Sequence, residues 1–135
     1  TSSTLLVERI RDVHTIHGKL HTTYSLPKEN FSTITKAKLT EFNDDVASLW
    51  NAADFIQRLT GGDALLKSEF PTKLKAFSQA LTRFVNLSES DKSTEKGKKN
   101  LDDLAALADK VGVGYSAFLA LLLKQAQLAL KMSLP

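Results

Sequence analysis

The segment that decides the fold reads FPTKLKAFSQALTRFVNL, residues 70–87. Its large apolar residues are separated by alternating steps of four and three positions, at Phe70, Leu74, Phe77, Leu81 and Phe84. This spacing places them on one face of an α-helix. Pro71 suits a first helical turn, where its missing N–H would have no intrahelical partner. The segment therefore predicts a helix over Pro71–Leu87 whose aromatic face must be covered by other helices.

The same rhythm predicts two longer helices upstream. The first runs over Ser3–Tyr24 and ends before Pro27, because a residue preceding proline is pushed out of the helical region. The second begins near Thr33 and reaches a Gly-Gly pair at Gly61, where glycine permits a left-handed cap. A short helical turn is expected over Ala64–Phe70.

Downstream, the pattern predicts two helices separated from the rest by a loop. The segment Ser88–Lys99 is polar and mixed in charge, which is typical of a mobile loop, with a helical turn inside it as an alternative. A short helix is expected to follow, with Asn100 as its N-cap and Gly112 as its end. The last helix is expected over Tyr115–Met132.

The last helix is the least amphipathic of the set. Five large apolar residues cover most of its circumference: Phe118, Leu119, Leu121, Leu122 and Leu123. Its first half is therefore expected to be surrounded. Taken with the short connections, the stripes predict an all-α fold, a single-domain antiparallel bundle of four to five helices over residues 1–135.

Composition excludes several kinds of chemistry. The chain has 135 residues, no cysteine and a formal net charge of +3. Without cysteine there is no disulfide framework, thiolate zinc site, iron–sulfur cluster or cysteine nucleophile. The positive charge is diffuse, because acidic residues offset the lysines of the 88–99 segment, which also lacks arginine and aromatic residues for base stacking. Nucleic acid is therefore not an expected partner.

All three histidines, His14, His17 and His21, lie on the first predicted helix. His17 and His21 are four residues apart and form the best chelating pair, although a weak one. No carboxylate stands three residues before any of the three, so the Glu-x-x-His pattern of diiron bundles is missing. We expect His17 to lie at the edge of the core, with no metal bound.

Residues 112–117 read GVGYSA and match a loose dinucleotide-binding pattern, G-x-G-x-x-A. That pattern requires a strand before it and an acidic residue about 20 positions after it. A predicted helix precedes it here, and no Asp or Glu follows Asp109. The glycines are expected to form a turn between helices, and no cofactor is expected. No Gly-x-Ser-x-Gly motif occurs and no Ser-x-x-Lys stands at a plausible nucleophile turn, so the protein is not expected to be an enzyme.

Three hypotheses remain: two binding functions, and an enzyme whose site no motif reveals. The leading hypothesis is a non-catalytic helical-bundle module that acts through protein–protein interaction. The alternative is a carrier of an apolar small ligand, such as a fatty acid or sterol, held in a cavity between Phe- and Leu-rich helices. The residues expected to line that cavity are Phe42, Trp50, Phe70, Phe77, Leu81, Phe84, Phe118 and Leu122.

The chain is expected to be soluble. Its longest apolar run, Ala117–Leu123, is far shorter than the roughly 20 residues that cross a bilayer, so no transmembrane segment is expected. Glycosylation-type sequons at Asn30 and Asn86 favour secretion only weakly. A homodimer is compatible with the predicted fold, because a second copy of the chain could cover the apolar last helix.

Overall fold

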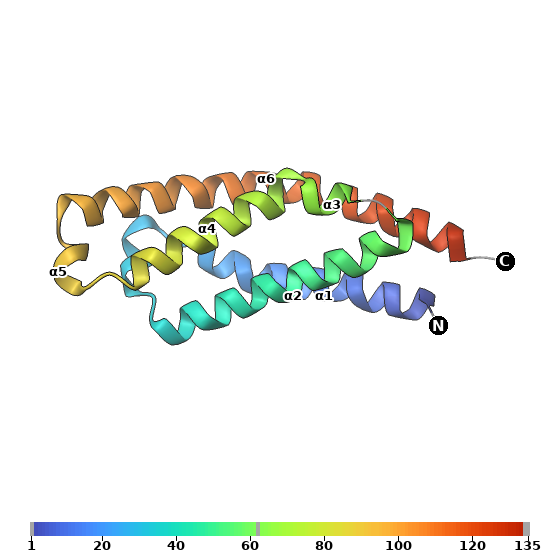
Figure 1. Ribbon diagram of the computed structural model, residues 1–135, viewed down its shortest axis with the longest axis horizontal. Helices are drawn as coiled ribbons and strands as arrows, with labels where there is room; N and C mark the ends of the chain where they lie inside the picture. Colours follow the sequence, from blue (N-terminus) through green and yellow to red (C-terminus); the bar gives the residue numbers. More distant parts are fainter. Residues whose placement is uncertain (1, 62, 134–135) are drawn as a thin grey trace.

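The computed structural model describes residues 2–61 and 63–133, and these contain helices and no strand. The all-α prediction is therefore confirmed. Figure 1 shows the elements in order along the chain: α1 (Ser2–Tyr24), the 3-10 helix η1 (Lys28–Thr33), α2 (Lys36–Thr60), α3 (Ala64–Lys67), α4 (Glu69–Val85), α5 (Glu89–Lys92) and α6 (Glu95–Ser133).

Four long helices form an elongated bundle, and consecutive long helices run antiparallel (Figure 1). α6 extends along most of the bundle and packs against α1, α2 and α4. α5 and η1 lie at one end of the bundle, and the two chain termini lie at the other. The buried apolar side chains of these elements form one core cluster.

The limits of α2 follow from local chemistry. α2 begins at Lys36, later than the predicted Thr33, because the residues after Pro27 form η1 instead. The hydroxyl of Thr35 accepts a hydrogen bond from the backbone N–H of Lys38 and caps the helix. At the other end, Gly61 has a φ of +79° and donates its N–H to the carbonyl of Gln57. The predicted glycine cap is therefore confirmed.

The short elements after α2 also differ from the prediction. The helical turn of α3 ends at Lys67 instead of continuing to Phe70, because Ser68 is extended, with a ψ of 166°. α4 then begins at Glu69, ahead of the predicted Pro71. Pro71 is thus in the first turn of α4, where it costs no intrahelical hydrogen bond.

The predicted break at Gly112 is wrong. α6 is one continuous helix of 39 residues, and both Gly112 and Gly114 lie inside it without a positive φ. A glycine inside a helix costs only about 1 kcal/mol relative to alanine, and packing of the flanking turns against α1 and α4 outweighs that cost. A Cβ added at Gly114 would lie 3.5 Å from Phe70, an ordinary van der Waals contact, so α6 lies against α4 here without requiring a glycine.

The prediction for Ser88–Lys99 is only partly right: the helical turn allowed for inside it is present as α5, but from Glu95 onward the segment belongs to α6 and not to a loop. The segment forms α5 and the first turn of α6, and the N-cap of α6 is supplied by Thr94, whose hydroxyl accepts from the backbone N–H of Gly97. Asn100, predicted as an N-cap, lies inside the helix. Gly97 is buried because the chain of α5 crosses directly over it.

The second half of α6 is less covered than its sequence led us to expect. By length and composition alone, Glu95–Lys131 would be long and apolar enough to cross a membrane. Its most apolar 18-residue window has a mean hydropathy of 1.5, yet only 22% of that window is buried. The first half of the predicted Tyr115–Met132 helix was expected to be surrounded, but Ala117, Ala120 and Leu123 are exposed within it, so that prediction is wrong. The absence of a transmembrane segment stays a prediction.

Candidate functional site

The structure places seven of the eight expected ligand-binding residues in the packed core. Trp50 alone is partly exposed. The aromatic rings among them contact one another: Phe42 and Phe77 meet edge to face at 5.7 Å between ring centroids, and Phe70 and Phe118 at 4.9 Å. These rings fill the space between the helices with each other.

A narrow apolar pocket lies where Trp50 of α2 and Phe118 of α6 come together, with Leu74 and Lys75 of α4 also lining it. Its volume is about 20 Å³. That is room for about one water molecule, whereas pockets for drug-sized ligands measure roughly 300 to 1,000 Å³. Of the eight expected residues, only Trp50 and Phe118 line this pocket. Binding of an apolar ligand here stays a prediction, and it requires the core to open.

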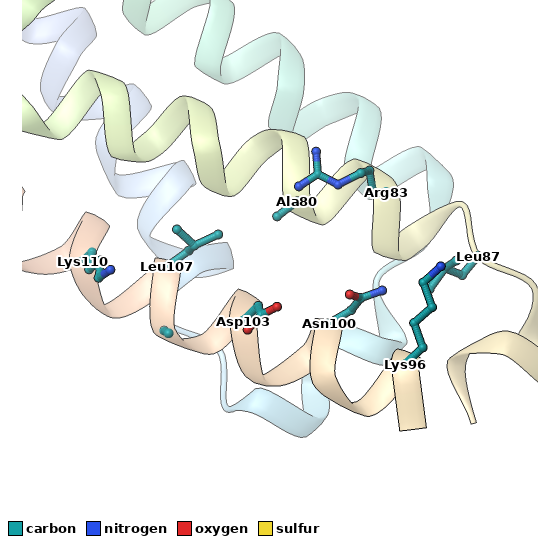
Figure 2. Close-up of a pocket in the computed structure, with 9 residues that line it drawn as sticks. Ala80, Arg83, Leu87, Lys96, Asn100, Asp103, Leu107 and Lys110 are labelled. Atoms are coloured by element: carbon teal, nitrogen blue, oxygen red, sulfur yellow. The ribbon is translucent and has the colours of Figure 1, made fainter. Parts of the chain in front are cut away.

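A much larger groove runs between α4 and α6 (Figure 2). It has a volume of about 550 Å³. Two residues of α4, one residue just after α4 and six from the first half of α6 line it: Ala80, Arg83, Leu87, Lys96, Asn100, Asp103, Ala106, Leu107 and Lys110. We call it the α4/α6 groove. Sequence reasoning missed it, because part of its wall was assigned to a loop.

Helical spacing brings the groove residues together. On α6, the lining positions 96, 100, 103, 107 and 110 recur every three or four residues and so form one stripe. In Figure 2, Asn100 and Asp103 rise from α6 toward α4, and Lys96 extends toward Leu87. Lys96 and Lys110 are about 21 Å apart along the helix axis, at 1.5 Å per residue. The site is therefore an elongated groove with a cation near each end.

The charges in the α4/α6 groove are not neutralised internally. Three cations, Arg83, Lys96 and Lys110, line it together with one carboxylate, Asp103. Within residues 2–61 and 63–133, none of these four side chains forms an ion pair. Neighbouring charges are paired elsewhere, as in the bridge from Lys28 to Asp102 at 2.7 Å. The groove therefore presents an excess of positive charge to whatever enters it.

A second cluster of polar aromatic residues lies between α1 and α6. The imidazole of His17 stacks on the ring of Tyr115, with 3.3 Å between centroids, and its Nε2 shares a hydrogen bond of 2.5 Å with the hydroxyl of Tyr24. Burial raises the pKa of Tyr24 to about 12. His17 thus lies at the edge of the core, as expected. Its ring centroid is 5.7 Å from that of His21, and the described residues contain no group of three or more metal-ligating side chains.

Stability is expected to depend on the protonation of His17. Burial, with smaller contributions from the imidazoles of His21 and His14, lowers the pKa of His17 to about 4. The unfolded chain has a histidine pKa of about 6.5. The folded state therefore favours the neutral imidazole. The stability that depends on neutral His17 is fully present above pH 6.5 and is lost as the pH falls from 6.5 toward 4. Because His17 is partly exposed, we expect a loss of about 1 to 2 kcal/mol over this window.

Urea unfolding of the wild type and of His17→Phe at pH 7 and pH 5 measures this contribution. Tyr115 of α6 and Tyr24 stay uncharged over this range, and Phe70 of α4 does not titrate, so protonation of His17 meets no compensating charge from them. The wild type should lose more stability than His17→Phe between the two pH values. Equal losses would show that other groups carry the pH dependence.

Comparisons with protein-family models, with curated proteins and with solved structures find no match to this chain. The α4/α6 groove is the candidate site, because it is a large, charged concavity whose cations form no ion pair within the described residues 2–61 and 63–133.

Proposed function

We propose that the protein is a non-catalytic binding module that acts through protein–protein interaction, and that the α4/α6 groove is its docking surface. The observation that carries the proposal is the set of three cations along one groove, none of which forms an ion pair in the part of the chain that the structure describes. Ion pairs at the rim of an interface act mainly on association rate and specificity. The groove therefore selects a partner that carries carboxylates.

The shape of the groove favours a peptide segment over a small anion. Its two terminal cations, Lys96 and Lys110, are too far apart for one small anion to touch both. Leu107, between them, and Leu87, beside the end of Lys96, supply apolar contact. A partner helix with acidic residues at its ends and apolar residues at helical spacing would match this pattern, as in other helix-in-groove complexes. It would pack against α4 and α6 as an additional helix of the bundle.

The lining of the groove also argues against nucleic acid. Asp103 would repel a phosphate backbone, and none of the nine lining residues is aromatic, so bases would have no ring to stack on. Binding of oligonucleotides and of acidic helical peptides, measured at several salt concentrations, distinguishes a nucleic-acid partner from a protein partner. Tight binding of an oligonucleotide, with no binding of acidic helical peptides, would contradict the proposal.

The test is a charge reversal in the groove. Arg83→Glu is expected to weaken binding of an acidic amphipathic peptide by about tenfold or more, because it replaces an attractive charge by a repulsive one. The peptide comes from a designed library, and binding is measured by calorimetry at low salt. Arg11→Glu is the matched control, because Arg11 is also exposed, lies on α1 and forms no ion pair among the described residues. Equal weakening in both variants would mean that net charge, and not the groove, attracts the peptide.

An apolar-ligand carrier is the second proposal, favoured by the narrow apolar pocket beside Trp50 and Phe118. An acyl chain would enter it only by separating α2 from α4, since the present volume accepts about one water. Native mass spectrometry followed by solvent extraction tests this proposal. A lipid-sized mass bound to the purified protein would support a carrier, and a clean unliganded mass after incubation with fatty acid would contradict it.

A further inference from the structure

The second half of α6 presents an apolar surface that lies outside the α4/α6 groove. Val113 is 83% exposed, Leu123 41% and Leu128 46%. Two alanines between them, Ala117 and Ala120, are also exposed. None of these five residues lines the groove. Large apolar side chains that remain this accessible on a monomer are candidates for an interaction surface.

The five residues share one side of the helix. At 100° per residue they fall within an arc of about 140°. The opposite side carries Phe118, Leu122 and Ala129, which are buried in the core. The second half of α6 therefore carries apolar side chains on both sides, one packed on the bundle and one facing outward, and the outward side also includes the exposed polar residues Ser116 and Gln127. We call the outward side, Val113 to Lys131, the α6 outer face.

The charges on the α6 outer face have one sign. Lys124 and Lys131 fall within the same arc and are exposed. No aspartate or glutamate follows Asp109 in the chain, so no acidic residue of α6 lies among these lysines. An exposed surface that combines apolar side chains with lysines and lacks carboxylates matches the boundary between lipid acyl chains and anionic headgroups.

We propose that the α6 outer face binds the surface of an anionic lipid bilayer. Its apolar side chains enter the headgroup boundary, and the two lysines extend their ammonium groups to lipid phosphates and carboxylates. The helix lies along the membrane and does not cross it, because its other side stays packed on α1, α2 and α4. A second copy of the chain fits this face less well, since it would bring lysines together with no carboxylate to pair with them.

Vesicle co-sedimentation tests this proposal at low salt. The wild type is expected to sediment with vesicles of phosphatidylcholine containing phosphatidylserine, and to stay in solution with phosphatidylcholine alone. Ala120→Glu should weaken sedimentation by about tenfold, because it places a carboxylate in the centre of the α6 outer face. Ala47→Glu is the matched control: it makes the same change at an exposed alanine on α2, and should bind as the wild type does.

A second measurement identifies the face that meets the lipid. The chain has no cysteine, so Ala120→Cys and Ala47→Cys each accept one environment-sensitive fluorophore. Emission should shift to the blue on addition of anionic vesicles for the label at 120 and not for the label at 47. Three results would overturn the proposal: no sedimentation with anionic vesicles, equal effects at positions 47 and 120, or a dimer that Ala120→Glu dissociates in the absence of lipid. None of these results bears on peptide binding by the α4/α6 groove, which Arg83→Glu tests separately.

Discussion

Replacing Phe77 by alanine is expected to destabilise the protein by about 3 to 5 kcal/mol. Phe77 is fully buried at the centre of α4. The edges of two other rings meet it from different elements, Phe31 of η1 at 5.9 Å and Phe42 of α2 at 5.7 Å between centroids. Because both neighbours are themselves buried, they cannot move far enough to fill the space that the ring leaves. Chemical denaturation monitored by circular dichroism measures the loss.

The matched control for this prediction is Phe55→Ala. Phe55 is only partly buried, on α2, and its ring lies beneath the guanidinium of Arg9 at 5.6 Å. Removing its ring leaves a space that is open to solvent, so we expect a smaller loss of stability, about 1 to 2 kcal/mol. Equal losses in the two variants would contradict the assignment of Phe77 to the centre of the core.

Replacing Gly97 by alanine is expected to cost about 2 to 3 kcal/mol. A Cβ at this position would collide with the backbone carbonyl oxygens of Asp91 and Lys92. A flexible side chain could rotate away, but a backbone carbonyl moves only if α5 moves as a whole. Thermal and chemical unfolding of the variant measure the cost. Greater hydrogen exchange in α5 is also expected, because the substitution displaces that element first.

Gly18→Ala provides the opposite control. Gly18 lies in the middle of α1, is exposed, and a Cβ there would meet no atom within 4 Å. The substitution should therefore stabilise the protein by about 0.5 to 1 kcal/mol, the difference in helix propensity between the two residues. A stabilising effect at Gly97 as well would mean that α5 does not pack against α6 as described.

The periodicity of the sequence predicted the long helices well, and failed where the outcome depended on competition between elements. α1 ends at Tyr24 as predicted, because Pro27 stops a helix by local sterics. At Gly112 and Gly114 the local signal pointed to a turn. The local cost of two glycines is small, however, and the contacts of α6 with α1 and α4 exceed it.

For the candidate sites too, the sequence predicted the features set within one helix and missed those that depend on helix pairing. The spacing of Phe70, Phe77 and Phe118 predicted correctly that these rings face inward. Periodicity reports which side of a helix is apolar, but a filled core and a lined cavity give the same pattern. The α4/α6 groove was not predictable, since Arg83 and Lys110 are far apart in sequence and only the pairing of two helices brings them to one site.

Local periodicity is enough to locate most of the helices and the buried face of each, because both depend on contacts between residues three or four positions apart. The continuity of α6, the filling of the core by aromatic rings and the uncovered outer face of α6 follow only from how the helices pack. These outcomes depend on which helix packs beside which, and free energy gained between distant segments can outweigh a local preference of about 1 kcal/mol.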